Sequence, residues 1–482
     1  MINIKSVLKV VAFLIILDGV GMLLGIPFSL YYGDSDWKDL LNTGGVLIVL
    51  GAIIFLFTFN NKLDIQKRES FIIVGLGWVV MSLFGALPFV VNGAIPSYTD
   101  AFFETMSGFT TTGSSILNNI EGMPHGLLFW RSLTQWFGGM GIIVLSLAIL
   151  PILGIGGMQL FVAEVPGPTK DKIHPRVRET AKRLWGIYAL LTLAETVLLM
   201  LGGMTFFDAI NHSFTTMATG GYSTKQASVG YFNSPFIQYI ITLFMFLAGM
   251  NFTLHYFWIH GKFNRIKNDD ELRFYFFITV AVAIVISIDL FVHNHGSLEK
   301  SFRDSIFQTV STITTTGYVT SDYESWGPFY QILFFILLFA GGCAGSTGGG
   351  IKMVRHRILM KNSLLELKRL LHPRAVLLVR FNGHVVPNNV LSNIMAFTFW
   401  YVAIFLIGTL LMSLAGLDFA SSIGAVATSL GNVGPGIGTV GPSFNFSNVS
   451  VPGKWLLSLL MLIGRLELFT ILIIFSRSFW KK

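Results

Sequence analysis

Charged residues are scarce in this chain of 482 residues. Asp, Glu, Lys and Arg together make up 12% of it, whereas about 25% is usual for a soluble domain. A soluble globule of this length needs charge to cover its surface, and a disordered chain needs low hydrophobicity, so the composition excludes both classes. Apolar residues account for 53% of the chain and its mean hydropathy is +0.67. These values indicate a protein that crosses a lipid bilayer several times.

Cysteine is scarcer still, because Cys343 is the single example and no disulfide can form within the chain. The net charge of +8 would suggest nucleic acid as the partner of a soluble protein. In a membrane protein such an excess reflects basic cytoplasmic loops instead, and we expect no nucleic-acid partner. The histidines have no metal-ligand spacing, no carboxylates pair within a span, and no Ser/His/Asp group stands out. We therefore expect no bound cofactor and no enzyme, such as an intramembrane hydrolase or lipid transferase.

Ten apolar stretches reach the roughly 20 residues that a membrane-spanning helix needs. They cover 7–31, 43–60, 71–92, 127–153, 183–204, 235–260, 273–293, 328–359, 389–415 and 454–480. The first is too long for a cleaved signal peptide and contains Asp18, which we expect to be half-buried near a helix terminus. With both termini cytoplasmic, 26 of the 33 Lys and Arg residues lie in or beside the inside segments and six in or beside the outside segments. This is the distribution that the positive-inside rule predicts.

The outside segments contain an internal repeat. Four short stretches too brief to span end in small residues, and they read DAFFETMSGFTTTG from Asp100, DAINHSFTTMATGG from Asp208, DSIFQTVSTITTTG from Asp304 and SSIGAVATSLGNVG from Ser421. Their aligned glycines are 107, 97 and 117 residues apart, which indicates four copies of one unit. Each unit comprises a span, a half-helix, a glycine-containing loop and a second span. The predicted divisions are two extra N-terminal spans at 1–65 and units at 66–160, 161–267, 268–372 and 373–482.

Such a unit has a physical use in a membrane. Unpaired backbone carbonyls are tolerated at membrane depth only where they line a water- or ion-filled path, and four sets of them can replace the hydration shell of a cation. The leading Asp of three copies suits the start of a half-helix as a cap, and the negative end of each half-helix dipole then favours a cation at the axis. Ordinary turns or small-residue helix contacts explain one such stretch, but four at a constant period favour a pore.

These motifs resemble the Trk/Ktr/HKT superfamily of potassium transporters, and most closely its bacterial TrkH family. The resemblance covers the whole chain and includes TTTG, MATGG, TTTGY, GNVGPG, GGCAGSTGGGIK at 341–352 and GRLELF at 464–469. It implies potassium uptake across the bacterial plasma (inner) membrane, with K+ as the transported ion. It also implies a homodimer with one pore in each chain and a cytosolic nucleotide-binding partner of TrkA type.

The resemblance also assigns the filter, whose backbone oxygens would come from three residues in each copy. These are Thr111, Thr112 and Gly113, then Ala218, Thr219 and Gly220, then Thr315, Thr316 and Gly317, and finally Asn432, Val433 and Gly434. In plant HKT relatives, serine at the first filter glycine accompanies sodium preference, so Gly113 implies a preference for potassium. The fourth copy differs most, which makes the filter only pseudo-fourfold.

A gate is expected where the span 328–359 contains six glycines among residues 341–350. Each glycine in a helix costs about 1 kcal/mol relative to alanine, so the helix should break there, and we expect no comparable break in the other three second spans. The candidate gate residues are Gly345, Ser346, Thr347, Gly348, Gly349 and Gly350. A tolerated kink is the alternative, and a nucleotide-binding loop is excluded because the GxxxxGK[ST] spacing is missing.

Arg465 is the one basic residue near the middle of a predicted span, which makes it a functional candidate. Its expected partner is Glu467 or a carbonyl of the glycine-rich loop, and the resemblance places it beneath the filter as a second part of the gate. Channel-like uptake is the favoured function. A proton- or sodium-coupled potassium symporter remains the alternative, because broken helices also occur in such carriers, and a sensor without transport is a third class.

Overall fold

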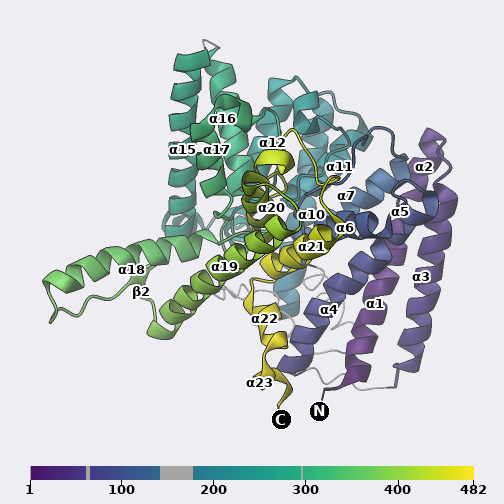
Figure 1. The fold of residues 1–482 in the computed structure, drawn as a ribbon, viewed down its shortest axis with the longest axis horizontal. Helices are drawn as coiled ribbons and strands as arrows, with labels where there is room; N and C mark the ends of the chain where they lie inside the picture. The colour runs from purple at the N-terminus through teal and green to yellow at the C-terminus, as the bar shows by residue number, and fades with distance from the viewer. Residues whose placement is uncertain (1, 61–65, 142–176, 295–296, 482) are drawn as a thin grey trace.

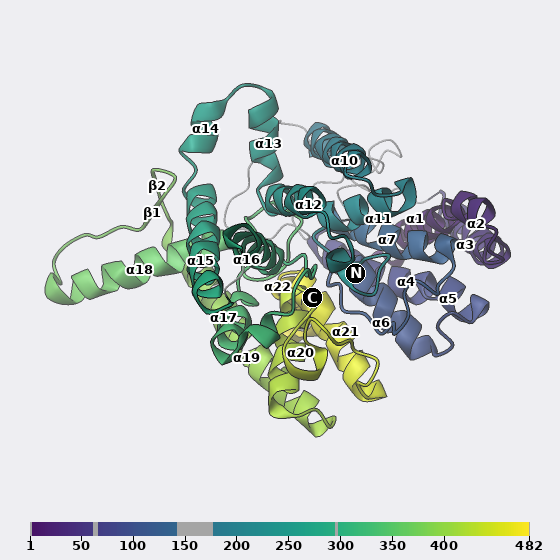
Figure 2. The same cartoon turned by 90° about the horizontal axis from the view of Figure 1, so that it is seen from above.

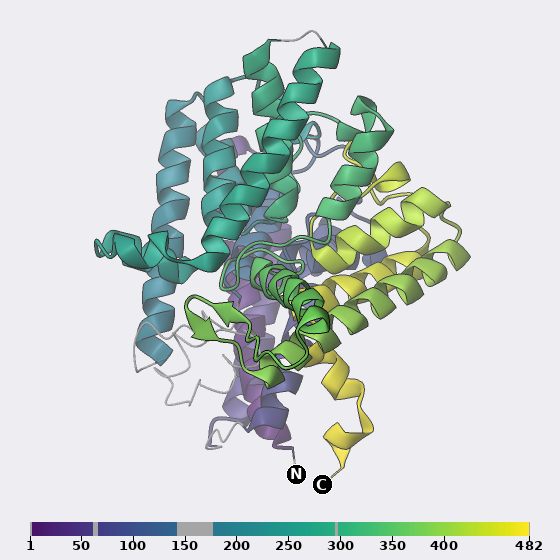
Figure 3. The ribbon, with the colours of Figure 1, turned by 90° about the vertical axis from the view of Figure 1, so that its left-hand side faces the viewer.

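The computed structural model describes residues 2–60, 66–141, 177–294 and 297–481. Within these ranges the regular structure is helical except for one antiparallel hairpin of β1 (Arg380–Phe381) and β2 (His384–Val385). The predicted all-α fold is confirmed. The end of the predicted span 127–153 and most of the basic loop 154–182 lie outside the described residues. Both termini lie at the same end of the molecule (Figures 1 and 3).

The two extra N-terminal spans form a helical pair that stands at one edge of the molecule (Figure 1). They consist of α1 (Ile4–Leu23) with α2 (Ile26–Tyr32), followed by α3 (Trp37–Phe57). A Cβ on Gly19 would lie 2.6 Å from the carbonyl oxygen of Gly44, and a Cβ on Gly44 would lie 2.8 Å from that of Gly19. Only residues without a side chain allow α1 and α3 to approach this closely.

Four further groups of helices follow one another around the centre in chain order (Figure 2). The first contains α4 (Lys67–Gly85), α5 (Leu87–Asn92), α6 (Tyr98–Phe109) and α7 (His125–Gly139). The second contains α10 (Val177–Leu201), α11 (Phe206–Met217), η1 (Ser228–Tyr231), α12 (Pro235–Ala248), α13 (Phe252–Ile259) and α14 (Phe263–Lys267). The third contains α15 (Asp270–Asn294), α16 (Leu298–Ile313), η2 (Tyr323–Trp326), α17 (Pro328–Leu337) and α18 (Met353–Leu371). The fourth contains α19 (Asn388–Leu414), α20 (Phe419–Gly431), η3 (Gly438–Val440), α21 (Val451–Arg465), α22 (Phe469–Phe475) and α23 (Arg477–Trp480).

The predicted spans divide into straight and broken ones. Six described stretches are long and apolar enough to cross a membrane, and they correspond to the first two spans and the first span of each unit. Two second spans are bent pairs, at 103° between α12 and α13 and at 116° between α21 and α22. The second span of the third unit is interrupted between α17 and α18. In the first unit, α7 ends at Gly139, near the limit of the described residues. The expectation that only the third unit has a break is therefore wrong.

The breaks occur where the second helices pass the ends of the half-helices. A Cβ on Gly138 would lie 1.9 Å from the carbonyl oxygen of Phe109, and a Cβ on Gly464 would lie 2.1 Å from that of Leu430. Beyond the bends, Asn251 caps α13, and the backbone of Glu467 and Leu468 has positive φ. Glycine at these crossings lets two backbones touch, so the breaks belong to the repeat.

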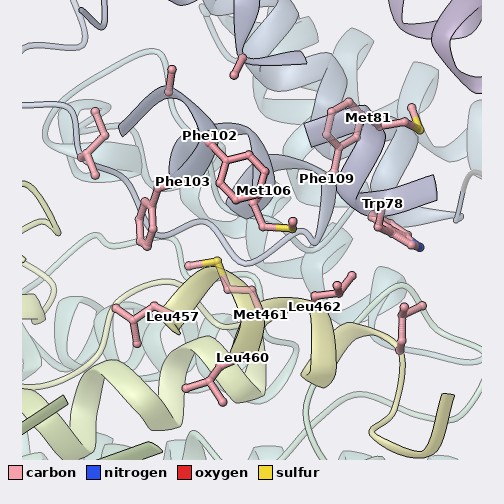
Figure 4. Packing of buried hydrophobic residues seen from close by; sticks show 14 of the residues in the cluster. Trp78, Met81, Phe102, Phe103, Met106, Phe109, Leu457, Leu460, Met461 and Leu462 are labelled. Carbon is pink, nitrogen blue, oxygen red and sulfur yellow. The ribbon is translucent and has the colours of Figure 1, made fainter. Parts of the chain in front are cut away.

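The half-helix of the first unit is held by a buried apolar cluster that joins the first and last units (Figure 4). Phe102, Phe103, Met106 and Phe109 of α6 pack between Trp78 and Met81 of α4 and Leu457, Leu460, Met461 and Leu462 of α21. Contacts between α6 and α21 close the ring of four units. On the opposite side, α18 and the β1–β2 hairpin project away from the body (Figures 1 and 2).

Candidate ion-conduction site

The site begins at the capped N-termini of the four half-helices. The caps are Ser97, Thr205, Ser297 and Asp418, and each side chain accepts a hydrogen bond from a backbone N–H three residues later. The predicted caps are therefore wrong, because Asp100 and Asp208 lie in the first helical turn and Asp304 lies deeper inside α16. The fourth copy does have an aspartate, but it is the cap itself. Acidic residues in the first turn still stabilise the helix, because their negative charge lies near the positive end of the helix dipole.

Each half-helix ends in the same backbone conformation. One residue with a left-handed φ follows the helix in every copy: Thr111 at 53°, Thr219 at 52°, Thr315 at 61° and Asn432 at 54°. Two residues later comes a glycine with positive φ: Gly113 at 82°, Gly221 at 75°, Gly317 at 78° and Gly434 at 105°. Residues other than glycine rarely adopt positive φ, so four occurrences at one position show that the four sequences share one loop structure.

The backbone pattern aligns the second copy one residue further along the chain than the alignment of the four sequences does. Gly221, and not Gly220, has the conformation of Gly113, and Ala218 lies at the position of Thr110 and Thr314. The hydrogen bonds agree, since Gly220 N donates to Thr215 O at 2.8 Å as Thr112 N donates to Ser107 O at 2.9 Å. The sequence contained a signal for this register, because a tyrosine follows both Gly221 and Gly317.

The four loops touch in a closed ring. A Cβ on Gly113 would lie 2.2 Å from Gly220 O, one on Gly221 1.9 Å from Thr316 O, one on Gly317 1.9 Å from Val433 O, and one on Gly434 2.9 Å from Thr112 O. Each glycine thus lies against a carbonyl of the next copy, and the fourth copy returns to the first. No side chain fits at these four positions without moving a backbone.

The carbonyl groups of this ring are buried, and most are left without a donor. Thr112, Thr316 and Val433 are 0%, 0% and 1% exposed, and among the described residues nothing donates a hydrogen bond to their carbonyl oxygens. Gly220 O accepts one from Gln135 Nε2 at 2.7 Å and has a second lone pair. Buried carbonyls normally have partners, so a ring of unpaired ones fits oxygen ligands for a cation. In the described part of the chain, no group of three or more His, Cys, Asp or Glu side chains offers an alternative metal site.

Side chains fix the loops in place. Asn432 Nδ2 donates to Thr112 Oγ1 and to Met461 O, both at 2.9 Å, which ties the fourth copy to the first. Thr110 and Thr112 share a hydroxyl hydrogen bond of 2.8 Å, and the equivalent pair Thr314 and Thr316 has the same distance. Gln135 was not predicted from the sequence, because nothing local distinguishes it from any other polar residue of a helix.

The glycine-rich loop lies directly against the ends of three half-helices. Thr347 Oγ1 donates to Met217 O at 2.9 Å, and Gly349 N donates to Thr315 Oγ1 at 2.7 Å. A Cβ on Gly349 would lie 2.6 Å from Gly431 O. The loop thus contacts the second, third and fourth copies. Gly345 and Gly350 have φ of 74° and 65°, angles that glycine adopts without strain.

The other residues that we expected in the gate tie the loop to its surroundings. Gly345 O accepts a hydrogen bond from Phe252 N at 3.0 Å, and Ser346 N donates to Cys343 O at 3.1 Å. The Lys352 ammonium donates to Gly348 O. These bonds give the loop one folded arrangement in place of a helix.

Arg465 lies at the end of α21 and connects the loop to the first unit. Its Nη1 donates to Thr347 O at 2.7 Å, and its Nη2 donates to Gly139 O at 3.0 Å and to Gly138 O. Of its two expected partners, the loop carbonyl is present, whereas Glu467 pairs with Arg355. A guanidinium therefore lies between the end of α7 and the end of α21, where it binds the glycine-rich loop.

Glu271, near the start of α15, was also missed by the sequence analysis. Its Oε1 accepts hydrogen bonds from Ala344 N at 2.7 Å and from Val354 N at 2.8 Å. One carboxylate oxygen thus holds the beginning of the loop and the start of α18 together. Charge-assisted bonds of this kind are about twice as strong as neutral ones, so Glu271 anchors both ends of the loop.

Asp18 differs from its expected setting. It lies within α1, is 0% exposed, and neither carboxylate oxygen has a partner among the described residues. The half-buried position near a helix terminus is therefore wrong. Glu195 of α10 is likewise 0% exposed, with both oxygens unpaired among the described residues.

Comparisons with known proteins agree with this geometry. The model of the TrkH family, described as a cation transport protein, matches residues 38–482. The chain is 41% identical to the Trk system potassium uptake protein TrkH of Salmonella typhimurium and 40% identical to that of Escherichia coli K12, over 99% of each chain. The crystal structure of the potassium transporter TrkH from Vibrio parahaemolyticus matches 100% of both chains with a TM-score of 0.89 and 40% identity. TrkH proteins are transporters and not enzymes, and the chain belongs to the TrkH family of cation transport proteins.

Proposed function

We propose that this chain takes up potassium through a channel-like pore in the bacterial plasma membrane. The single observation that carries the proposal is the closed ring in which each filter glycine lies against a carbonyl of the next copy. The relatives named as potassium uptake proteins support K+ as the ion. An inside-negative potential supplies about 2.3 kcal/mol per 100 mV for each K+ that enters, so uptake needs no catalytic residue.

In this proposal the ion is bound by backbone oxygens of the corrected filter residues. These are Thr111–Gly113, Thr219–Gly221, Thr315–Gly317 and Asn432–Gly434, and Ala218 is left out. The half-helices end at these residues, so the negative ends of four helix dipoles face the ion. Gly113 keeps its part of the ring free of a side chain, which supports a preference for potassium over sodium.

The loop at 341–350 and Arg465 form the gate. The loop contacts the half-helix ends of the second, third and fourth copies. Arg465 donates hydrogen bonds to the loop and to the end of α7, which lies against the half-helix end of the first copy. A fixed positive charge beneath the filter repels a cation, and at 4 Å the cost is up to about 4 kcal/mol with an effective dielectric constant of about 20. Opening requires the loop and the guanidinium to move aside together.

Regulation and assembly complete the proposal. We infer a homodimer with one pore per chain, cytoplasmic termini, and a TrkA-type cytosolic nucleotide-binding regulator. The basic residues of α18 and its neighbouring hairpin, which project from the body, supply a surface for such a regulator (Figure 2). The names of the relatives as parts of a Trk system support a multi-subunit arrangement.

The test is rescue of a bacterium that lacks potassium uptake, with Gly113→Ser alongside the unchanged chain. The expected result is growth at low potassium with the unchanged chain and weaker discrimination against sodium with the variant. Uptake into proteoliposomes without a proton or sodium gradient then separates a channel from a symporter. Dependence of K+ entry on either co-ion would refute the channel-like mechanism, and failure to support growth would refute potassium uptake.

A further inference from the structure

A buried ion pair lies behind the filter between the first and second units. Glu104 of α6 and Arg131 of α7 have side chains that are 1% and 3% exposed, and Arg131 Nε lies 2.7 Å from Glu104 Oε1. Neither residue belongs to the filter or to the gate described above. Burying two charges is costly, and replacing such a pair with apolar residues is often neutral or stabilising. Stability alone is therefore a poor explanation for the pair.

Both partners bind the segments that leave the filter. Glu104 Oε2 accepts a hydrogen bond from Ile116 N at 2.9 Å, just after the first filter loop. Arg131 Nη1 donates to Ser223 O at 3.1 Å, just after the second loop. Ser115 Oγ bridges the two, at 3.0 Å from Glu104 Oε1 and 3.2 Å from Arg131 Nη2. The pair therefore connects the exits of two neighbouring filter loops.

Tyr222 continues this connection to the filter itself. The Arg131 guanidinium lies 3.5 Å from the centre of its ring, and its hydroxyl donates to Glu104 O at 2.6 Å. Its backbone N donates to Gln135 Oε1 at 3.1 Å, while Gln135 Nε2 donates to Gly220 O, a carbonyl of the ring. Arg131 and Gln135 are four residues apart on α7 and thus share one face. A continuous set of contacts joins the ion pair to a filter carbonyl.

The other junctions between units are built differently. Glu104 lies seven residues before the residue with left-handed φ in the first copy. The same count places His212, Gln308 and Ala425 at this position in the other three copies. Tyr318 OH donates to His212 O at 3.0 Å, as Tyr222 OH does to Glu104 O. The tyrosine contact is thus repeated at the second junction, but among the described residues a buried carboxylate–guanidinium pair at this position occurs only at the first.

We propose that Glu104 and Arg131 are positioning residues that determine ion selectivity by fixing the spacing between the first and second filter loops. The inference deepens the proposed function and rests on it. Discrimination between K+ and Na+ depends on oxygens held at set positions, and the carbonyl oxygens of Thr112, Thr316 and Val433 accept no hydrogen bond from the described residues that would hold them. The pair acts through Tyr222 and Gln135 and does not touch the ion.

The decisive variant is the double substitution Glu104→Met and Arg131→Met. It removes both charges together, so no unpaired charge stays buried. The purified variant is reconstituted in a bilayer with K+ on one side and Na+ on the other, and the reversal potential is measured. We expect the K+/Na+ permeability ratio to fall about tenfold, or about 1.4 kcal/mol, which shifts the reversal potential by about 60 mV at about 2.3 kcal/mol per 100 mV.

A matched control removes an exposed pair far from the filter. Glu366 on α18 belongs to such a pair, with a side chain that is 54% exposed, and Glu366→Gln, which breaks the pair, should leave the reversal potential unchanged. The reversal potential does not depend on how much protein is inserted, so a structural loss alone would not move it. Arg131→Lys retains the charge without the planar fork and should give an intermediate shift.

Each outcome decides the proposal. A reversal potential equal to that of the unchanged chain in the double variant, or in Arg131→Lys if the double variant does not fold, overturns it. A shift in the control as large as that in the double variant also overturns it. If the unchanged chain itself shows no preference for K+, the proposed function fails, whereas a selective chain with an equally selective double variant refutes only the role of the pair.

Discussion

The four loops of the proposed filter and the interruptions that follow α12, α17 and α21 use the same fourfold repeat in different ways. In the filter, four sequences as unlike as Thr-Thr-Gly and Asn-Val-Gly adopt one backbone and form a closed ring. The helices α12, α17 and α21 all end before the end of the predicted spans, but the connections that follow them differ. Sharp bends follow α12 and α21, whereas a long loop follows α17. In the proposed function this difference has a physical reason: four oxygens must surround one ion, which favours symmetry, whereas a gate needs a single element that can move.

The largest effect is expected from breaking the symmetry of the ring at Gly221. In Gly221→Ala the new Cβ would lie 1.9 Å from Thr316 O, and the φ of 75° adds strain of about 1–2 kcal/mol. We expect K+ uptake at equal expression to fall about 100-fold or more, or about 2.7 kcal/mol.

Gly220→Ala is the matched control for this register. Its Cβ would meet the side chain of Gln135, which can move, so the loss should be about tenfold smaller. Uptake rates of both variants in potassium-deficient cells measure the difference. A larger loss of uptake in Gly220→Ala than in Gly221→Ala would contradict the alignment of Gly221 with Gly113 and support Gly220 in its place.

The next effect tests the asymmetric interruptions through Arg465. Arg465→Ala removes the charge and the bonds to Thr347 O and Gly139 O, so K+ flux into proteoliposomes should rise about tenfold, or about 1.4 kcal/mol. Arg477→Ala, at an exposed arginine of α23, should change the flux by less than about twofold, or about 0.4 kcal/mol. A flux equal to that of the unchanged chain in Arg465→Ala would remove Arg465 from the gate.

The smallest effect concerns the anchor of the loop. Glu271→Gln keeps an acceptor for Ala344 N and Val354 N but loses the charge, which roughly halves the strength of each bond. We expect flux to rise about threefold, or about 0.7 kcal/mol, with selectivity unchanged. Glu299→Gln, at an exposed residue of α16, serves as the control. A selectivity change in Glu271→Gln without a change in flux would show that the anchor acts on the filter and not on the gate.

The positions where the backbone requires glycine could be predicted from the sequence, whereas the packing contacts between units could not. Glycine at 113, 317 and 434 was predicted from the repeat and the resemblance, and each has the positive φ that glycine adopts without strain. The shift from Gly220 to Gly221 could not be settled by glycine alone, since two adjacent glycines fit the motif equally well. The caps were misassigned for a similar reason: a serine or threonine three residues before an aspartate competes with it for the same role.

The sequence by itself determined that this chain spans the membrane, repeats one unit four times and carries a basic residue, Arg465, near the middle of the last span. Scarce charge and a regular period in the outside loops leave little freedom on those points. Tertiary structure alone decided which carbonyl meets which glycine, that the second spans of the second and fourth units are interrupted after α12 and α21 as well as that of the third after α17, and that Glu104 pairs with Arg131. These features join residues far apart in the chain, such as Tyr222 with Glu104 across 118 positions and Asn432 with Thr112 across 320. Such contacts form only when the four units pack around one axis, and no local pattern encodes them.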